Sequence, residues 1–313
     1  MQRAIQLALC GEAAAAPNPM VGAVVVHEGR IIGESFHRRC GGPHAEVNAI
    51  GSVRPEDVPL LCRSTIYVTL EPCAHWGKTP PCADLIIRQG IPRVVVGCRD
   101  PFAKVDGLGI AKLREAGCEV VVGVLEQECR ELNRVFMTYH GLHRPFVTLK
   151  LAQRPDGSTD GRISTPFTTM LVHRLRSRCD AIMVGTNTML ADHPSLTVRH
   201  WTARDTQPLR ITIDRHHRLP EDVTRGFIVY HEETIPEILS DLYRRGVQHL
   251  LVEGGRTLHR AFVDAGYCDE WRVETSCKRS DHSIDGNTIE WSQSERMNSS
   301  HSRELPFLPK TFL

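Results

Sequence analysis

The chain has 313 residues, and its 38 Lys and Arg nearly balance its 37 Asp and Glu, which leaves a net charge of +1. Hydrophobic residues make up 41% of the sequence, a value typical of globular proteins that excludes collagen, coiled coil and wholesale disorder. The length predicts two domains. The charge balance argues against broad nucleic-acid binding, and no apolar run approaches the roughly 18 residues of a membrane span.

The N-terminal segment MQRAIQLALCGEAAAA resembles a secretory signal, but Glu12 interrupts its apolar stretch. It leads directly into the turn PNP and a strand, so we expect an amphipathic helix and a cytoplasmic protein that does not bind membranes. The chain contains eleven cysteines. In such a protein they predict metal ligands or reactive thiols rather than a disulfide framework.

The first half of the chain alternates helix and strand signals. VGAVVV and RIIGESF, joined by a turn at Glu28-Gly29, predict a β-hairpin. The β-branched runs that follow are separated by helical segments, which indicates an α/β fold with both sheet faces covered. The other expected elements are helices near 4–9, from about 44, near 82–89 and near 108–116, and strands at 65–70, 93–98 and 118–124.

A helical segment at 128–145 ends in a Gly/His/Pro break, which predicts domains at residues 1–143 and 144–313. The second domain is expected to be α/β and doubly wound. Its expected strands are 146–152, 181–185, 209–214, 227–231, 249–255 and 270–275, with helices at 167–178, 235–245 and 257–265. From about residue 277 the sequence is polar and turn-rich, which predicts a loosely held tail without regular structure.

The strongest functional signal is the succession of the motifs PHAE, EPC and PPC, which contain His44, Cys73 and Cys82. One imidazole and two thiolates bind zinc tetrahedrally and leave its fourth position for water, as in a catalytic site. Glu46 follows His44 at the start of a helix, where its carboxylate can reach that water without binding the metal. The pattern therefore favours one catalytic zinc per chain and hydrolytic deamination of a heterocyclic amine.

Two other interpretations of these motifs remain open. A structural zinc would take a fourth protein ligand, which Cys62, His75 or His37 could supply. A site without metal is also open, because HxE occurs by chance and both cysteines could be buried apolar thiols. Glu46 distinguishes the alternatives, since a structural zinc site has no use for a carboxylate beside the metal.

HAE followed by PC and a later Cys resembles the zinc-dependent nucleoside and nucleobase deaminases. Eight residues separate the two cysteines in PCAHWGKTPPC, where two are usual in that superfamily. This longer form, together with PNPMVG (17–22) and DP (100–101), resembles the riboflavin-pathway deaminase–reductase family. The family deaminates 2,5-diamino-6-ribosylamino-4-pyrimidinone 5′-phosphate and then reduces its ribose to ribitol.

The resemblance implies a cytidine-deaminase-like fold for the first domain and a role for each motif residue. The implied zinc ligands are His44, Cys73 and Cys82, with Glu46 as the proton shuttle. The residues implied to line the substrate pocket are Asn18, His75 and Lys78. The charge of Lys78 suits a phosphate group, although an exposed lysine without a partner is the more common case.

Three segments of the second half predict a ligand site, at residues 184–199, 209–215 and 249–262. Each contains a strand end, and ligands of open α/β sheets bind at the carboxyl ends of strands. We expect the first segment to continue from its strand as a polar loop. Gly254 and Gly255 stand at a strand-to-helix turn, where backbone N–H groups favour an anion. The absence of GxGxxG argues against a Rossmann dinucleotide site.

Together the three segments resemble the reductase domain of the same family, which has a dihydrofolate-reductase-like fold and uses NADPH. The implied cofactor-binding residues are Ala152, Thr188, Asp192, Gly255 and Thr257. The implied substrate-binding residues are Leu196, Arg199 and Glu253. Arg199 would pair with the ribose phosphate through its planar guanidinium, whereas Asp192 could instead cap a helix or turn.

The chain departs from the family at residues 152–166, which form a shorter segment than is usual. Arg162 stands where an aromatic residue is common, and Arg215 where a small polar residue is common. Both arginines could bind the 2′-phosphate of the cofactor, or these departures could weaken reduction.

We therefore expect a bifunctional enzyme that uses zinc and NADPH on a small-molecule ribotide, as a monomer or a homo-oligomer, and that binds no nucleic acid. One alternative is a nucleobase or nucleoside deaminase with a degenerate second domain. The other is a zinc-stabilised binding protein without catalytic activity.

Overall fold

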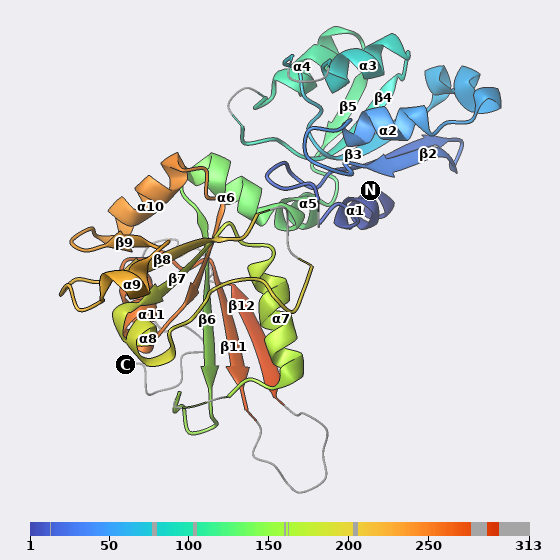
Figure 1. Cartoon of the computed structure of the whole chain (residues 1–313). Coiled ribbons are helices and arrows are strands. Elements are labelled where there is room, and N and C mark those ends of the chain that lie inside the picture. Colours follow the sequence, from blue (N-terminus) through green and yellow to red (C-terminus); the bar gives the residue numbers. More distant parts are fainter. Residues whose placement is uncertain are drawn as a thin grey trace, which may run out of the picture. The chain divides into compact units, whose positions relative to one another are not determined.

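The computed structural model describes residues 1–12, 14–76, 80–102, 105–159, 161, 163–202, 206–276 and 287–293. The chain divides into two compact units, unit 1 at Met1–His143 and unit 2 at Arg144–Leu313. Each unit combines one sheet with helices (Figure 1). Among the described residues, no helix has both the length and the apolar character needed to cross a membrane.

The sheet of unit 1 has five strands. They are β1 (Gly22–His27), β2 (Arg30–Phe36), β3 (Thr65–Leu70), β4 (Arg93–Cys98) and β5 (Glu119–Val122). Their order across the sheet is β2-β1-β3-β4-β5. β1 pairs antiparallel with β2 and β3, whereas β3, β4 and β5 run parallel. The expected hairpin is confirmed, and its turn places Glu28 and Gly29 at positive φ.

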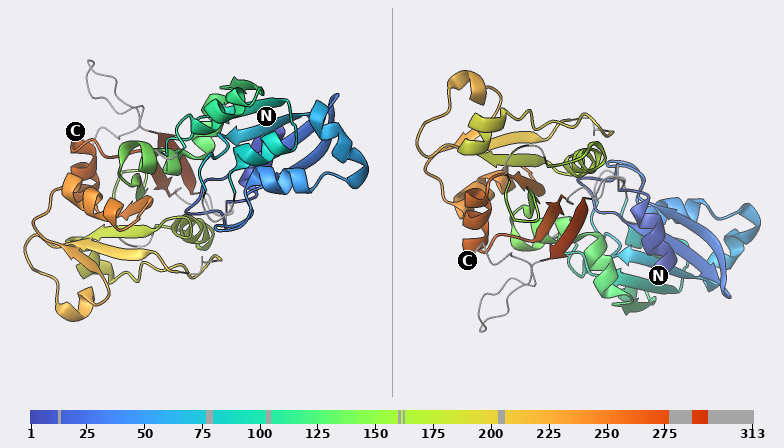
Figure 2. Two further views of the ribbon diagram at one scale, coloured as in Figure 1. Left: turned by 90° about the horizontal axis from the view of Figure 1, so that it is seen from above. Right: turned by 90° about the horizontal axis from the view of Figure 1, so that it is seen from below.

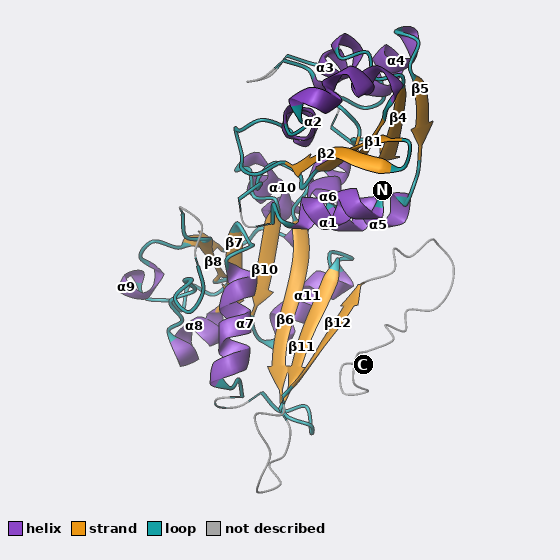
Figure 3. Ribbon diagram, turned by 90° about the vertical axis from the view of Figure 1, so that its right-hand side faces the viewer, coloured by secondary structure: helices purple, strands orange, loops and turns teal. Residues whose placement is uncertain are grey.

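Helices lie on both faces of this sheet (Figure 3). They are α1 (Gln2–Leu9), α2 (Ala45–Gly51), α3 (Cys82–Arg88), α4 (Leu108–Glu115), α5 (Glu126–Leu132) and α6 (Arg134–Leu142), with a 3-10 helix η1 at Pro55–Arg63. Apolar side chains of α2, α3 and α4 share a core with β1, β3 and β4. α1 and α5 come close to the sheet backbone, because side chains at Gly22 and Gly97 would collide with them.

The sheet of unit 2 has seven strands. They are β6 (Phe146–Gln153), β7 (Ala181–Gly185), β8 (Leu209–Ile213), β9 (Ile228–Tyr230), β10 (His249–Glu253), β11 (Glu270–Thr275) and β12 (Thr288–Gln293). Their order is β12-β11-β6-β10-β7-β8-β9, and every neighbouring pair except β11 with β12 is parallel. The carboxyl ends of β6, β10, β7 and β8 therefore meet at one edge of the sheet.

Helices flank the sheet of unit 2 (Figure 2). Their apolar side chains belong to two separate cores. The helices are α7 (Pro166–Arg176), α8 (Thr186–Asp192), α9 (Glu221–Thr224), α10 (Ile235–Arg244) and α11 (Arg256–Asp264). α10 and α11 contribute to one core, and α7 and α8 to the other. The start of α7 is determined by neighbouring residues, because Thr165 and Thr168 form a capping box and Pro166 is the first helical residue.

Most predicted elements are confirmed with small shifts at their ends, but two expectations were wrong. The tail is not wholly irregular, because residues 288–293 form β12 and pair with β11. Strand β12 lies at the sheet edge and has no alternating burial, which explains its weak signal. The expected loop after β7 is the helix α8, in which only Met189 is buried, so no apolar period marks it.

The expected helix at 128–145 is divided into α5 and α6 at Asn133. The short elements η1 and α9 were not anticipated; η1 buries only Asp57 and Leu61, and α9 buries no residue. Residues 277–286 and 294–313 lie outside the described part of the chain.

Candidate functional site

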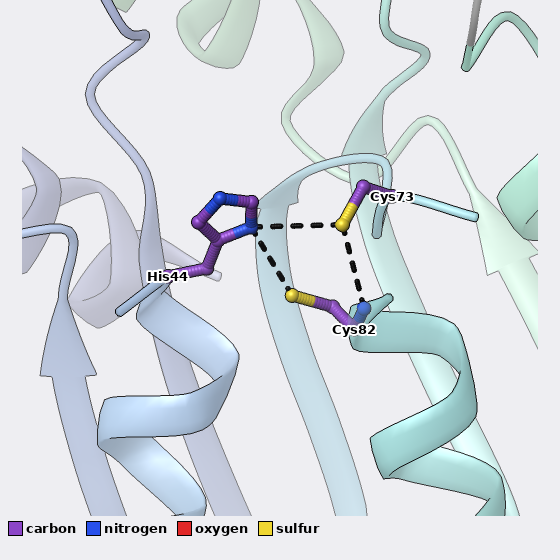
Figure 4. A group of neighbouring side chains, drawn as sticks. All are labelled: His44, Cys73 and Cys82. Atoms are coloured by element: carbon purple, nitrogen blue, oxygen red, sulfur yellow. Dashed lines mark hydrogen bonds between the residues drawn. The ribbon is translucent and has the colours of Figure 1, made fainter. Parts of the chain in front are cut away.

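Three side chains that could hold a metal ion come together in unit 1. The ligand atoms of His44, Cys73 and Cys82 all lie within 4.8 Å of one another. Nδ1 of His44 is 3.6 Å from Sγ of Cys73 and 3.3 Å from Sγ of Cys82, and the three side chains converge (Figure 4). Within the described ranges no other group of His, Cys, Asp and Glu is arranged in this way.

The ends of secondary-structure elements place all three side chains. His44 precedes the first residue of α2, Cys82 is the first residue of α3, and Cys73 follows β3 after two residues. The backbone N–H of Cys82 donates to Sγ of Cys73 at 3.4 Å. The N–H of Ala83 donates to the carbonyl of Cys73 at 3.2 Å. The N-terminus of α3 thus holds Cys73 and favours its thiolate form.

The spacing of these atoms fits a zinc ion. Tetrahedral zinc, with Zn–N near 2.0 Å and Zn–S near 2.3 Å, separates nitrogen from sulfur by roughly 3.5 Å. The hydrogen bond with Cys82 and the neighbouring His44 lower the pKa of Cys73 to about 4, so a thiolate is available at neutral pH. The structural-zinc alternative needs a fourth ligand, and the group contains neither Cys62, His37 nor His75.

Glu46 lies in the first turn of α2, and its side chain is almost completely buried. Burial raises the pKa of Glu46 to about 7, although the nearby His44 opposes the shift. A carboxyl group that titrates near neutral pH can both accept and donate a proton. The structure therefore places a carboxyl group whose pKa suits proton transfer two residues from His44, one of the three clustered side chains.

Side-chain hydrogen bonds connect the N-terminal loop to this site. Nδ2 of Asn18 is 3.2 Å from Nε2 of His37, whose ring meets that of His44 edge-on with 5.6 Å between centroids. The side chain of Asn133 holds the backbone of Met20 through both its N–H and its carbonyl, each at 2.8 Å. The sequence analysis did not single out His37 or Asn133 for this role, since neither belongs to a local motif.

Glu71 connects the segment that contains Cys73 to the loop that follows β4. Its buried carboxylate accepts backbone N–H groups from Asp100 at 3.4 Å, Gly107 at 3.0 Å, Gly109 at 3.0 Å and Ile110 at 3.2 Å. The last three come from the start of α4, where a carboxylate is favourable. The Glu of the EPC motif thus organises the loop that follows β4.

His75 lies beside an aromatic side chain on that loop. Its ring centroid is 6.1 Å from that of Phe102, and its buried Nδ1 has no hydrogen-bond partner within the described residues. An unpaired buried nitrogen of this kind suits a ligand group. Lys78, the third residue implied to meet the substrate, lies outside the described residues.

In unit 2 the residues implied for the cofactor lie near the carboxyl edge of the sheet. Ala152 is near the end of β6, and Arg215 follows β8. Thr188 and Asp192 belong to α8, which directly follows β7. Gly255 precedes α11, and Thr257 lies in its first turn. These elements follow strands that neighbour one another in the sheet. Arg162 lies outside the described residues.

The two glycines after β10 differ in their surroundings. A Cβ at Gly254 would come within 3.4 Å of the backbone nitrogen of Gly185. The ends of β10 and β7 therefore lie close together at this position. A Cβ at Gly255 would meet no atom within 4 Å. Open space therefore adjoins the N-terminus of α11, where the helix dipole favours an anion.

The residues implied for the substrate in unit 2 have different environments. Leu196 is 1% exposed and packs in the core beside α7 and α8, so its side chain is not available to a ligand. Arg199 is exposed. The carboxylate of Glu253 forms two hydrogen bonds with Arg176, at 2.6 and 2.8 Å.

A row of charged residues crosses the same sheet in register. Lys150 of β6 pairs with Glu253 of β10 on one side and with Arg272 of β11 on the other. Burial lowers the pKa of Lys150, while Glu253 opposes the shift. The sequence analysis overlooked Lys150, although a charged residue inside the apolar run FVTLKLA was a usable signal.

Comparisons with known proteins agree with this geometry. Residues 1–98 match the family model of the cytidine and deoxycytidylate deaminase zinc-binding region, and residues 145–276 match that of the RibD C-terminal domain. Riboflavin biosynthesis protein RibD of Aquifex aeolicus is 39% identical over 302 residues, covering 86% of this chain and 83% of the relative. The chain belongs to the RibD family.

Other RibD proteins extend this similarity to solved structures. RibD of Escherichia coli is 35% identical over 315 residues, covering 86% of this chain and 84% of the relative. Acinetobacter baumannii RibD superposes with a TM-score of 0.79 at 31% identity, covering 98% of this chain and 92% of that one. The chain is also similar to a Thermotoga maritima protein, a diaminohydroxyphosphoribosylaminopyrimidine deaminase/5-amino-6-(5-phosphoribosylamino)uracil reductase. That structure superposes with a TM-score of 0.75 at 38% identity, covering 91% of this chain and 88% of that one.

Membership of the RibD family confirms the main expectations from the sequence. The chain is a bifunctional enzyme of riboflavin biosynthesis, with a zinc-binding deaminase domain and an NADPH-dependent reductase domain. The expected fold class, a cytidine-deaminase-like domain followed by an α/β reductase domain, is confirmed as well. The roles of individual residues remain predictions.

Proposed function

We propose that residues 1–143 deaminate 2,5-diamino-6-ribosylamino-4-pyrimidinone 5′-phosphate and that residues 144–313 then reduce the ribose of the product. The convergence of His44, Cys73 and Cys82, with the buried Glu46 close by, is the observation that carries the proposal. The similar Thermotoga maritima protein is named for a deaminase and a reductase of this kind.

In the deaminase domain, zinc held by His44, Cys73 and Cys82 would lower the pKa of a bound water and place positive charge beside it. Glu46 takes a proton from the water as its oxygen attacks the amino-bearing ring carbon, and passes a proton to the adjacent ring nitrogen. Glu46 then takes the second proton from the hydroxyl now bound to that carbon and delivers it to the amino group, which leaves as ammonia while the hydroxyl oxygen becomes a carbonyl. One water is consumed for each ammonia released.

The substrate of this domain is expected to contact Asn18, His75 and Lys78. The amide of Asn18 and the unpaired Nδ1 of His75 offer hydrogen bonds to the polar edge of a pyrimidine. Lys78 supplies a positive charge for the ribose phosphate.

In the reductase domain, NADPH would supply the hydride that reduces the opened ribose. The open space beside Gly255 at the start of α11 suits a phosphate of the cofactor. The remaining cofactor contacts are proposed at Ala152, Thr188, Asp192 and Thr257, with Arg162 and Arg215 for the 2′-phosphate. The proposed substrate contacts are Leu196, through its backbone, together with Arg199 and Glu253.

A cytoplasmic location suits this proposal, because the described cysteines are free thiols, as is usual in a reducing compartment. An assembly of identical chains remains a prediction that light scattering of the purified protein would test.

Incubation of the purified full chain with the diaminopyrimidine ribotide, followed by mass analysis of the products, tests the proposal. Without NADPH we expect an amino group to be exchanged for oxygen, and with NADPH we expect two further hydrogens. Deamination without NADPH consumption would overturn the reductase half alone. No turnover of the ribotide, with deamination of cytidine or adenosine instead, would favour a nucleoside deaminase.

A further inference from the structure

Side chains hold three consecutive backbone residues in unit 2, at 197–199. The carbonyl of Thr197 accepts from Nη1 of Arg176 at 3.2 Å. The N–H of Val198 donates to Oε1 of Gln207 at 2.7 Å, and its carbonyl accepts from Nε2 of Gln207 at 3.3 Å. The N–H of Arg199 donates to Nδ1 of His173 at 3.0 Å. A segment outside any strand or helix is thus held by three separate side chains.

The bond from Arg199 determines the state of His173. Because a backbone N–H can only donate, Nδ1 of His173 must be the unprotonated nitrogen and Nε2 carries the proton. His173 is 2% exposed, and burial lowers its pKa to about 4. The imidazole therefore remains a hydrogen-bond acceptor throughout the neutral pH range.

Residues 196–199 differ in burial. Leu196 and Val198 are buried, whereas the side chain of Arg199 is exposed. Nη1 of Arg199 bonds to the hydroxyls of Ser195 and Thr197, and the described residues include no carboxylate that pairs with it. Hydroxyls leave the positive charge of a guanidinium uncompensated, which suits an anionic ligand.

Helix α7 connects the segment that carries Arg199 to the carboxylate of Glu253. His173 and Arg176 lie three residues apart on α7, so their side chains leave the same face of the helix. His173 holds the backbone of Arg199, while Arg176 binds both the carbonyl of Thr197 and the carboxylate of Glu253. α7 thus sets the position of the 197–199 segment relative to the end of β10.

We propose that His173, together with Gln207, is a positioning residue of the reductase domain that presents the guanidinium of Arg199 to the phosphate of the ribotide. This inference rests on the proposed function, in which Arg199 meets that phosphate. Neither His173 nor Gln207 needs to touch the substrate, because each acts through the backbone that carries Arg199.

The test uses the full chain loaded with zinc, with the deaminated ribotide and NADPH as substrates. His173→Phe removes the acceptor but keeps a ring, whereas His173→Asn restores an oxygen near the place of Nδ1. The matched control is His200→Phe, because His200 is exposed and its ring meets that of His173 edge-on, at 4.8 Å between centroids, a contact that phenylalanine can keep. Gln207→Glu replaces the donor to the carbonyl of Val198 and keeps an acceptor for its N–H, at an exposed position where substitutions usually change stability little.

Loss of one buried hydrogen bond of this kind changes binding roughly 5- to 50-fold. We therefore expect His173→Phe and Gln207→Glu to raise the KM of the ribotide by such a factor, with the KM of NADPH and kcat within about twofold. His173→Asn should recover much of the loss, and His200→Phe should change nothing. Inhibition by ribose 5-phosphate should weaken in parallel with the KM.

A double-mutant cycle separates positioning from general damage. In an Arg199→Ala background, His173→Phe should raise the KM of the ribotide no further, because the group that it positions is gone. An equal rise in both backgrounds would overturn the proposal, as would an unchanged KM in both His173→Phe and Gln207→Glu. If His173→Phe does not fold, judged by circular dichroism, Gln207→Glu decides alone in the same cycle.

The cycle also separates this inference from the proposed function. If Arg199→Ala itself leaves the KM of the ribotide unchanged, the assignment of Arg199 to the phosphate is wrong and the positioning role falls with it. If Arg199→Ala raises that KM while the His173 and Gln207 variants do not, the proposed function stands and only the positioning role is overturned.

Discussion

Asn18 donates from Nδ2 to Nε2 of His37 across 3.2 Å, and this contact determines which way the amide of Asn18 faces. Nδ1 of His37 lies 3.1 Å from the carbonyl oxygen of Pro43, which can only accept, so Nδ1 carries the ring proton. Burial lowers the pKa of His37 and keeps the ring neutral. Nε2 is then an acceptor, Asn18 must donate to it, and Oδ1 of Asn18 is left to accept from a ligand.

Replacing Asn18 by Asp should therefore impair deamination. A carboxylate cannot donate to Nε2 of neutral His37, so two acceptors would face each other. We expect kcat/KM for ammonia release to fall roughly 10- to 100-fold, the effect of one lost polar contact with an unsatisfied partner. Zinc content and reductase activity of the same variant are the controls. An unchanged kcat/KM would show that the orientation of this amide does not matter.

Removal of one thiolate should release the metal. We expect the wild-type chain to contain about one zinc and Cys73→Ser to contain much less, since a neutral hydroxyl replaces an anionic ligand. Cys82→Ser should behave in the same way. Cys62→Ser, at an exposed thiol outside the cluster, is the matched control. Full zinc content in both cluster variants, measured by metal analysis, would contradict the ligand assignment.

Glu46→Gln should separate proton transfer from metal binding. Glutamine is nearly isosteric and the carboxylate is not among the clustered ligands, so zinc content and fold should be retained. Deamination should fall by about 10²- to 10⁴-fold, as expected for loss of a general acid/base. Reductase activity, assayed with the deaminated ribotide, should not change. Near-normal ammonia release would mean that another group moves the protons.

Acid should destabilise unit 2 through a buried histidine. His259 is fully buried, Nε2 donates to the carbonyl of Val252 at 3.1 Å, and burial lowers its pKa to about 4. In the unfolded chain this histidine binds a proton below about pH 6.5, whereas in the folded chain it stays neutral down to about pH 4. The free energy of unfolding therefore falls as the pH drops from 6.5 toward 4. The linkage amounts to about 2 kcal/mol between pH 7 and pH 5.

His259→Gln keeps a donor to Val252 but cannot titrate. Urea unfolding of the two proteins at pH 7 and pH 5 should therefore show a smaller loss of unfolding free energy in the variant. His173, whose pKa is lowered in the same direction, is present in both proteins and does not affect the difference. Equal losses in the two proteins would contradict the assignment.

The success of the sequence analysis depended on how local each signal was. Strands such as TIYVTL and RVVVGC bury alternate or continuous apolar side chains, so their own residues identify them. β12 has no such pattern, since it is held at the sheet edge by its pairing with β11. α8 buries only Met189, so its sequence has no apolar period that would predict a helix.

The candidate site shows the same contrast between local signals and contacts of distant segments. The motifs HAE, EPC and PPC contain the residues that the structure brings within 4.8 Å of one another, because motif spacing reflects which element ends face each other. Asn133 and its partner Met20 are 113 residues apart. Lys150 could have been noticed as a charge within an apolar strand, but its partners Glu253 and Arg272 come from other strands.

The sequence by itself determined the α/β class, the family and the chemical types of the candidate ligands, because apolar periodicity and short motifs are properties of neighbouring residues. Only the tertiary structure decided the donor and acceptor roles of Asn18 and His37, the four hydrogen bonds of Glu71 and the clamp on residues 197–199. These arrangements consist of directional hydrogen bonds between distant segments. Such bonds depend on where the folded backbone places each group, and they leave no periodic trace in the chain.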